Sequence, residues 1–267
     1  MVPQNNYRGR LAPSPTGFLH LGHALTFWTA QERARKGVLV LRIEDLDADR
    51  CRAEFRAAIE EDLRWFGIEW QEGPYFQSDR DYLPEWRRLR DAGLIYPCTC
   101  SRRDVALAIS APHGEDEPVY PGTCRHRLAE AGSIENPEGV NWRFRVPDGE
   151  EIVFRDGRMG ERRAVAGQDF GDFVVWRKDN IPSYQLAVMA DDAAMRITEV
   201  VRGEDLLQST FRQILLYRAL GLEETGWYHC PLVRDDEGRR LAKRDKALGL
   251  RELRESGAEP GQLRGII

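Results

Sequence analysis

Two histidines, His20 and His23, flank Gly22 at a junction where a short strand-like run at residues 10–12 gives way to a helix-like run. The first N–H groups of a helix have no partner inside it, and the helix dipole adds partial positive charge there. The junction therefore predicts a phosphate-binding site. The alternative is an ordinary strand-to-helix connection with two surface histidines, and these residues alone do not decide between the two.

Three cysteines form a second group, with Cys98 and Cys100 separated by one residue and Cys124 further along. Thiolates at this spacing can surround one zinc ion with tetrahedral geometry, and their segment has few large apolar residues, so a structural zinc would stabilise it. The alternative is three unrelated buried cysteines. The fourth ligand is open between Tyr120 and His126. Chemistry alone favours the imidazole, because a phenol must lose a proton with a pKa of about 10.

Charged side chains follow two further strand-like runs. Glu44 follows the apolar run at residues 38–43, and Arg202 ends the run at 197–202. Ligands of open α/β sheets bind beyond the carboxyl ends of the strands, so Glu44 should face the crevice of the histidines. Arg202 would pair with a carboxylate if it faces the same crevice. The alternative for Arg202 is an acidic neighbour at the surface. Lys243, in the most basic loop, could neutralise a leaving pyrophosphate, although a solvated loop explains it better when it is taken alone.

These side chains require a strand–helix–strand unit, with a strand ending at 10–12, a helix over 24–35 that ends at Gly37 and a parallel strand over 38–43. Two amphipathic helices are expected at 51–66, capped by Asp49, and at 80–92, with a loop between them. Later strands are expected at 140–146, paired with 151–154, and at 170–177, 197–202 and 227–233. Later helices are expected at 209–220 and 250–255, and residues 96–137 should form an insertion.

The composition is that of a globular protein, with 42% hydrophobic and 31% charged residues among 267 and a formal net charge of −5. No apolar run approaches the roughly 20 residues that span a membrane, and the N-terminus lacks the apolar core of a signal peptide, so we expect a cytoplasmic protein. An odd number of cysteines then favours metal or free thiols over a disulfide framework. The negative charge argues against a protein that coats nucleic acid, but not against an RNA bound by a local basic surface.

Six ordered segments carry a resemblance to a known family. The resemblance is to the catalytic half of class I glutamyl-tRNA synthetases, covers about residues 7–249 and rests on RLAPSPTGFLHLGH, LRIEDLD, YPCTCSRRD, DFVVWRKDNIPSYQLAVMADDA, ITEVVRGEDLLQST and RLAKRDKA. Residues 20–23 resemble the HIGH signature of that family, and residues 240–244 resemble its KMSKS loop. The resemblance implies an α/β fold, namely a Rossmann-like class I aminoacyl-tRNA synthetase catalytic domain with a zinc-binding insertion and a mixed α+β connective subdomain.

The sequence continues only briefly beyond the KMSKS-like loop, and we expect no anticodon-binding domain. It therefore resembles the truncated branch of the family, the glutamyl-Q tRNA(Asp) synthetases, whose short insertion matches Cys98, Cys100, Tyr120 and Cys124. The resemblance implies two catalytic halves at residues 1–95 and 193–267, a zinc-binding insertion at 96–137 and a connective subdomain at 138–192. It favours Tyr120 as the fourth zinc ligand, while chemistry keeps His126 open.

The activity that the resemblance implies is activation of glutamate by ATP without tRNA, followed by transfer of glutamate to the queuosine base at the anticodon wobble position of tRNA(Asp). Arg202 would hold the side-chain carboxylate of glutamate and Glu44 its α-ammonium group. The implied glutamate-binding residues are Arg10, Leu11, Ala12, Pro13, Ser14, Glu44, Tyr184 and Arg202. The implied ATP-binding residues are His20, Gly22, His23 and Lys243, of which His20, His23 and Lys243 would be catalytic. One structural Zn²⁺, Mg²⁺ accompanying ATP, and a monomer are expected.

Two residues of the KMSKS-like loop depart from the signature. Ala242 stands in place of the serine and Arg240 in place of the first lysine, but Lys243 keeps its charge, so we expect activation to survive. Two alternatives remain. One is a minimal conventional glutamyl-tRNA synthetase that charges a tRNA 3′ end. The other is a zinc-stabilised tRNA-binding module that is inactive because of Ala242.

Overall fold

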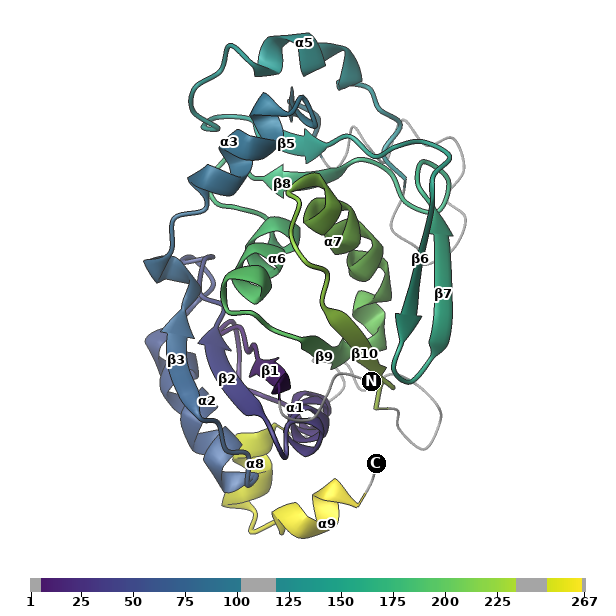
Figure 1. Ribbon diagram of the computed structural model, residues 1–267. Coiled ribbons are helices and arrows are strands. Elements are labelled where there is room, and N and C mark those ends of the chain that lie inside the picture. Colours follow the sequence, from purple (N-terminus) through teal and green to yellow (C-terminus); the bar gives the residue numbers. More distant parts are fainter. Residues whose placement is uncertain (1–5, 102–118, 234–248, 266–267) are drawn as a thin grey trace.

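The computed structural model describes residues 6–101, 119–233 and 249–265, which form an elongated body (Figure 1). The lower part of that view holds a parallel sheet with the strand order β1-β2-β3. Its strands are β1 (Arg8–Leu11), β2 (Val38–Ile43) and β3 (Glu72–Phe76). Two more parallel strands, β9 (Glu199–Gly203) and β10 (Gly226–Cys230), lie in the middle of the molecule.

The two groups of parallel strands meet at β1 and β9. The N–H group of Thr198, next to β9, donates to the carbonyl oxygen of Arg8 in β1 at 2.8 Å. Taken across this junction, the strand order is β3-β2-β1-β9-β10, which is the order of a doubly wound Rossmann fold. The order reverses between β1 and β9, so the fold predicts a ligand crevice at the carboxyl ends of these two strands.

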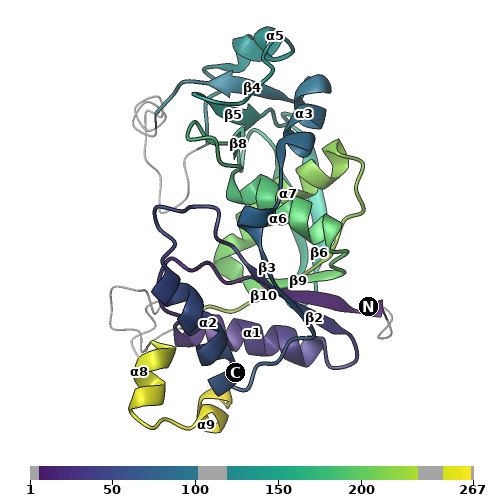
Figure 2. The ribbon, with the colours of Figure 1, turned by 90° about the vertical axis from the view of Figure 1, so that its left-hand side faces the viewer.

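Helices cover both faces of these strands (Figure 2). One face carries α1 (Leu21–Arg33) and α2 (Ala53–Trp65), and the other carries α6 (Tyr184–Ala194) and α7 (Leu207–Ala219). Successive side chains of a strand point to opposite faces of the sheet. Leu39 and Leu41 of β2 therefore pack in the core between the sheet and α1 and α2, while Val40 packs in the core between the sheet and α6 and α7. This arrangement explains why residues 38–43 are apolar throughout.

A second sheet forms the upper part of the molecule in Figure 1. It is antiparallel, with the order β4 (Ile95–Cys98), β5 (Asn141–Phe144) and β8 (Phe173–Trp176), and is flanked by α3 (Leu83–Asp91) and the short α5 (Leu128–Ala131). Trp86 of α3 packs edge to face on Trp142 of β5, with ring centroids 4.8 Å apart. This contact fixes α3 on the sheet.

A hairpin of β6 (Glu151–Asp156) and β7 (Gly160–Val165) joins the central strands at one point, where Asp156 pairs with Trp227 of β10. The chain ends with α8 (Leu250–Glu255) and α9 (Pro260–Arg264), beside α2 in Figure 1. Single 3₁₀ turns lie at Gln77–Asp79, Arg125–Arg127 and Glu204–Leu206. The pairing of Asp156 with Trp227 places the β6–β7 hairpin beside β10.

Several predicted elements are correct and several are wrong. The strand at 38–43 and the helix at 250–255 have the predicted bounds, but the expected loop after α2 contains β3. This strand contains Pro74, which is tolerated because β3 lies at the edge of the sheet. Residues 151–154 pair with β7 rather than with β5, whose partners are β4 and β8.

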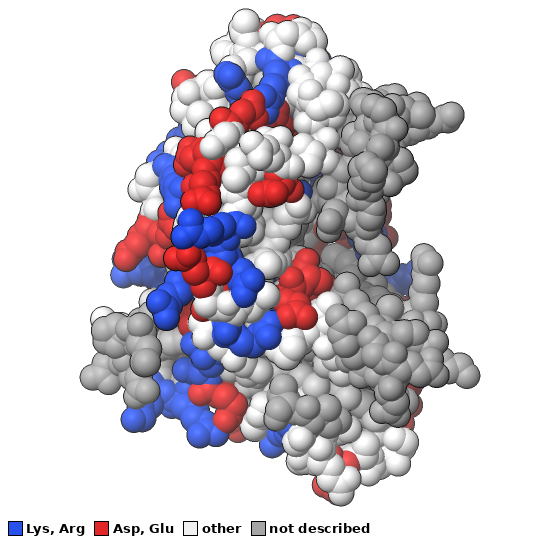
Figure 3. All heavy atoms as spheres, turned by 90° about the vertical axis from the view of Figure 1, so that its right-hand side faces the viewer, with Lys and Arg blue, Asp and Glu red and all other residues white. Residues whose placement is uncertain are grey.

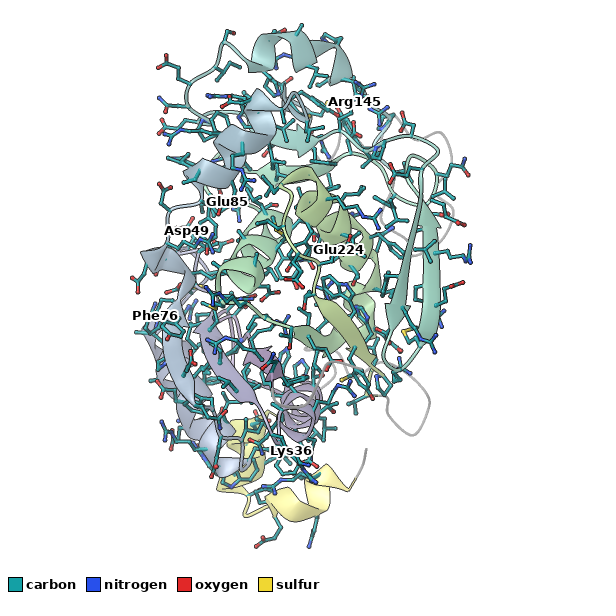
Figure 4. All side chains as sticks on the ribbon, in the orientation of Figure 1. Lys36, Asp49, Phe76, Glu85, Arg145 and Glu224 are labelled. Carbon is teal, nitrogen blue, oxygen red and sulfur yellow. The ribbon has the colours of Figure 1, made fainter. Side chains whose placement is uncertain are left out.

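Two predicted helix boundaries are also wrong. Helix α1 ends at Arg33, before Gly37. Asp49 lies in the connection before α2 (Figure 4) and does not cap it, because the helix begins at Ala53 behind Arg52, which makes no capping hydrogen bond. The chain thus enters α2 without the side-chain cap that the composition of this connection suggested.

Charges of both signs lie side by side on the described part of the face shown in Figure 3. On the hairpin, for example, Arg163 pairs with both Glu151 and Glu161. Such exposed pairs contribute little to stability, and they keep the local field small. Among the described residues, no helix is long and apolar enough to cross a membrane.

Candidate active site

A pocket of about 370 Å³ lies at the carboxyl ends of β1, β2, β9 and β10. Each of these strands contributes lining residues at or just after its end: Ala12, Pro13 and Ser14 after β1; Glu44 after β2; Arg202 and Gly203 at the end of β9; Pro231, Leu232 and Val233 after β10. The pocket occupies the point where the strand order reverses. It is therefore in the crevice that a doubly wound fold offers to its ligands.

The two histidines form the N-terminal end of α1 and line the pocket. The backbone N–H of each donates to Nδ1 of the other at 3.4 Å, and the rings stack with centroids 3.6 Å apart. Because Nδ1 accepts in both rings, a neutral imidazole at either position carries its proton on Nε2. A Cβ atom at Gly22 would lie 3.1 Å from Cε1 of His20, so glycine leaves room for the stacked rings.

A buried ionic network supports one wall of the pocket. The guanidinium of Arg42 is fully buried; its Nη1 donates to Asp192 at 2.7 Å and its Nη2 to Glu44 at 3.2 Å. Arg10 lies 3.4 Å from the same Asp192 and donates to the carbonyl oxygen of Val201 at 2.8 Å. Burial raises the pKa of Glu44, and the adjacent Arg42 guanidinium opposes that shift. The network holds Arg10 of β1 and Glu44 of β2 in fixed positions beside the pocket.

A neighbouring part of the wall carries a cation with neutral partners. Arg202 is 4% exposed, and it donates to Tyr184 Oη at 3.3 Å, to Thr210 Oγ1 at 2.7 Å and to His229 Nε2 at 3.4 Å. Burial lowers the pKa of this guanidinium. No carboxylate within the described segments forms an ion pair with it. A buried cation without a counter-ion is costly, so this wall is suited to an anionic group of a ligand.

Sequence reasoning missed the residues behind Arg202. Thr210 of α7, His229 of β10 and Asp156 of β6 are all buried, and His229 Nδ1 lies 2.6 Å from Asp156 Oδ2. The available signals were weak: a histidine in an apolar strand, and an aspartate before a glycine turn. Burial and the neighbouring Arg202 lower the pKa of His229 to about 4, which keeps its ring neutral near pH 7.

The cysteine group lies at the junction of the upper sheet with the segment around residue 124. The sulfur atoms of Cys98, Cys100 and Cys124 lie within 4.8 Å of one another. Tyr120 Oη is 3.5 Å from the sulfurs of Cys98 and Cys100 and accepts the backbone N–H of Cys124 at 3.0 Å. His126 is outside this group, because its exposed ring bonds through Nδ1 to the carbonyl oxygen of Thr123 at 3.1 Å.

These four side chains fit a tetrahedral metal ion. Zinc–thiolate bonds of about 2.3 Å place sulfur atoms about 3.8 Å apart, within the spread observed here. Arg143 adds a positive charge beside the group: its Nε donates to Cys98 Sγ at 3.3 Å, and its guanidinium lies 3.9 Å from the centroid of the Tyr120 ring. The guanidinium thus places a cation beside ligands that are anionic when they bind a metal.

A second cavity, of about 1130 Å³, lies between the cysteine group and the first pocket. Cys100 and Tyr120 line it at one end, and Tyr184 lines both cavities. Its basic lining residues are Arg50, Arg143, Arg177, Lys178 and Arg212. Three acids, Asp47, Asp172 and Asp179, line it as well, and Arg177 is paired with Asp47 at 3.0 Å and with Asp179. Five basic against three acidic side chains leave a small positive excess at this approach to the pocket.

The structure brings most of the predicted site residues together. The residues around the first pocket include Arg10, Ala12, Pro13, Ser14, His20, Gly22, His23, Glu44, Tyr184 and Arg202. Leu11 is different, because its side chain is fully buried in the core and does not line the pocket. Lys243 and the rest of the KMSKS-like loop lie outside the described residues.

Comparison with known proteins agrees with this architecture. The family "tRNA synthetases class I (E and Q), catalytic domain" matches residues 6–265. The chain is similar to the glutamyl-Q tRNA(Asp) synthetase of Nitratidesulfovibrio vulgaris, with 44% identity over 97% of this chain and 85% of the relative. The corresponding enzyme of Rhodobacter capsulatus is 43% identical over 97% of this chain and 98% of the relative.

Conventional synthetases match over a smaller share of their own length. The glutamate–tRNA ligase of Hydrogenobaculum sp. is 40% identical over 96% of this chain and 56% of the relative. The crystal structure of a glutamate tRNA ligase from Elizabethkingia meningosepticum in complex with its amino acid superposes with a TM-score of 0.71, at 27% identity, over 90% of this chain and 52% of that chain. This chain thus spans about half the length of that solved structure.

The fold and these matches define a class I aminoacyl-tRNA synthetase catalytic domain with mixed α/β structure, whose family implies glutamate, ATP and tRNA as partners. The chain belongs to the class I tRNA synthetases of the glutamate and glutamine type, among relatives named glutamyl-Q tRNA(Asp) synthetases, and it is a ligase. The resemblance predicted from the six sequence segments is confirmed.

Proposed function

We propose that this protein activates glutamate with ATP, without needing a tRNA, and transfers the glutamate to the queuosine base at the wobble position of tRNA(Asp). The observation that carries the proposal is Arg202, a buried cation at the pocket wall whose hydrogen-bond partners are neutral. Glutamate offers the side-chain carboxylate that this wall lacks. The names of the relatives described above supply the nucleic-acid substrate.

In this proposal, glutamate spans the pocket. Its side-chain carboxylate binds Arg202 and Tyr184, and its α-ammonium group binds Glu44. The main chain of residues 10–14 and the side chain of Arg10 enclose it. Arg10 and Glu44 are already fixed by Asp192 and Arg42, so binding orders few side chains and positions the α-carboxylate with little entropy cost.

ATP would lie at the N-terminus of α1, with its phosphates near His20, Gly22 and His23. An oxygen of the glutamate α-carboxylate attacks the α-phosphorus, the bond to the bridging oxygen breaks, and pyrophosphate leaves. The Nε2 proton of each stacked imidazole provides a donor for charge that develops on the phosphates. Lys243 would neutralise the leaving pyrophosphate, and Mg²⁺ would enter with ATP as part of the substrate.

The second cavity would admit the nucleic acid. Its basic side chains can contact phosphates, and Tyr184 lies where the cavity meets the glutamate pocket. A nucleophilic group of the base would attack the carbonyl carbon of the adenylate, and AMP would leave. Zn²⁺ would be held by Cys98, Cys100, Tyr120 and Cys124, where it would keep the wall of this cavity folded.

The deciding experiment has two parts. Glutamate-dependent exchange between ATP and labelled pyrophosphate should proceed without tRNA and should be lost in Lys243→Ala, which would exclude an inactive binding module. Labelled glutamate should then enter tRNA(Asp) that contains queuosine but not the same tRNA without it. Labelling of tRNA(Glu) at its 3′ end would instead establish the conventional activity of the glutamate–tRNA ligases.

A further inference from the structure

Two buried residues, Thr210 and His229, connect Arg202 to the carboxylate of Asp156, which it does not touch. Arg202 Nη2 lies 2.7 Å from Thr210 Oγ1, which lies 2.9 Å from His229 Nε2, and His229 Nδ1 lies 2.6 Å from Asp156 Oδ2. The four residues come from β9, α7, β10 and β6, so the hairpin is needed to complete the chain of contacts. All four side chains are at least nine-tenths buried.

The chemistry of these groups permits one direction of hydrogen bonding. A guanidinium can only donate, so Thr210 Oγ1 accepts from Arg202. An ionised carboxylate can only accept, so His229 carries its proton on Nδ1 and leaves a lone pair on Nε2. The Thr210 hydroxyl then donates to Nε2. The hydrogen bonds therefore all run in one direction: Arg202 donates to Thr210, Thr210 donates to His229, and His229 donates to Asp156.

The carboxylate end of this chain is itself held rigidly. Asp156 Oδ1 accepts the backbone N–H groups of Arg158 and Met159 at 2.9 and 2.8 Å, and Oδ2 also accepts the backbone N–H of His229 at 3.0 Å. These bonds lower the pKa of Asp156 although burial opposes them, so the group is ionised. A fixed anion therefore sets the tautomer of His229, as an aspartate orients a histidine in other buried pairs.

We propose that Thr210, His229 and Asp156 are positioning residues for Arg202 and make this wall selective for a ligand carboxylate over a neutral amide. The inference rests on the proposed function, because it assigns the carboxylate to glutamate. These three residues, called the relay below, fix the plane of the Arg202 guanidinium through hydrogen bonds to its Nε and Nη2 atoms. The Asp156 carboxylate is separated from Arg202 by two neutral side chains, so it does not form an ion pair with the guanidinium, which can pair with a ligand carboxylate instead.

The alternative states of His229 would undo this arrangement. With the proton on Nε2 instead, the ring would point a donor at the Nε–H of Arg202 and turn the lone pair of Nδ1 toward the Asp156 carboxylate. A protonated ring would place a second buried cation beside the first. Either state would turn Arg202 away from the pocket or leave polar groups unpaired.

The test compares two substitutions at one position. Thr210→Val keeps the shape of the side chain but removes the hydroxyl, whereas Thr210→Ser keeps the hydroxyl and removes a methyl group. We expect Thr210→Val and His229→Asn to raise the KM for glutamate about 10-fold or more, because a hydrogen bond to a charged group is lost. The KM for ATP should stay within about 2-fold, and preference for glutamate over glutamine should fall. Thr210→Ser should remain close to the original protein.

The outcomes separate relay and function. An unchanged KM for glutamate in Thr210→Val, or equal losses in Thr210→Ser, would show that the hydroxyl only fills space. Independently of any activity, ¹⁵N NMR of the histidine side chains should show His229 in the Nδ1–H tautomer, its signals identified by their absence in His229→Asn. An Nε2–H or charged ring overturns the relay even if the enzyme is active. Absence of glutamate-dependent exchange overturns the function and leaves the tautomer result to decide the relay.

Discussion

At the scale of residues, the pocket presents two charged groups with different partners, Glu44 and Arg202. Glu44 shares Arg42 with Asp192, whereas the hydrogen-bond partners that the described residues offer to Arg202 are neutral. A ligand with an ammonium group and a separate carboxylate satisfies both charged groups at once, and glutamate has both. The arrangement is largely formed before a ligand binds, because its charged side chains are buried and hydrogen-bonded to fixed elements.

The contribution of Glu44 can be measured with Glu44→Gln. The amide keeps the size of the side chain but loses the charge that would hold the α-ammonium group, so the KM for glutamate should rise about 10- to 100-fold. The KM for ATP should change little. Pyrophosphate exchange at varied glutamate and ATP gives both constants. Glu54→Gln, the same change at an exposed position of α2, is the control. A KM for glutamate equal to that of the control would contradict the assignment.

At the scale of elements, α8 connects the histidine end of the pocket to the core. His20 forms an antiparallel bridge with Gly249, and the N–H of Leu250 donates to the carbonyl oxygen of Leu19 at 2.8 Å. On the other side of α8, Arg254 lies 3.4 Å from the buried Asp62 of α2. These contacts fix the point at which the chain returns after the KMSKS-like loop, directly beside the histidines.

Asp62 makes this anchor sensitive to pH. Burial raises its pKa from 3.8 to about 6, and neither carboxylate oxygen has a hydrogen-bond partner in the described part of the chain. The native state therefore favours the protonated acid, and stability is lost as the pH rises from about 4 to 6. Asp62→Asn should be more stable than the original protein by up to about 3 kcal/mol at pH 8, and by about half of that at pH 5.

Urea unfolding of both proteins at pH 5 and pH 8 measures this difference. Glu61→Gln is the matched control, because Glu61 also pairs with Arg254, at 2.9 Å, but is 66% exposed. Its effect should be small at both pH values. If the gain of Asp62→Asn is the same at pH 5 and pH 8, the buried carboxyl does not titrate in this range and the explanation is wrong.

At the scale of the whole molecule, the features that could be predicted from the sequence are those that depend on local patterns, such as the ends of strands. Hydrophobic periodicity shows where a strand ends, and Glu44 and Arg202 were both expected at strand ends. Both residues line the pocket in the structure. The relay behind Arg202 was not predictable, because it depends on one pairing between the hairpin and β10, at Asp156 and Trp227. Likewise, β3 exists because β2 offers it an edge, which overrides the turn-like Gly-Pro pair.

The molecule also divides into separate cores, which leads to a prediction about metal removal. A small core of its own is formed by Tyr96, Cys98, Tyr120 and Cys124, apart from the core beneath the first pocket. Among the described residues, Cys100 and Tyr120 of the cysteine group line the second cavity, and no member of the group lines the first pocket. A chelator that strips zinc should therefore leave tRNA-independent exchange within about 2-fold, while labelling of tRNA(Asp) falls roughly 10-fold.

Elemental analysis of the same samples must first show one zinc per chain before chelation and none after it. Both activities are then measured, and zinc is added back to restore the labelling. Cys124→Ser should reproduce the chelated state, whereas Cys51→Ser, outside the group, should keep its zinc and both activities. We expect chelation to reduce labelling of tRNA(Asp) more than pyrophosphate exchange. The proposed zinc site lies at the wall of the second cavity, where the tRNA would enter, and not at the first pocket, where the adenylate would form. An equal loss of exchange and labelling would mean that the metal supports the whole fold.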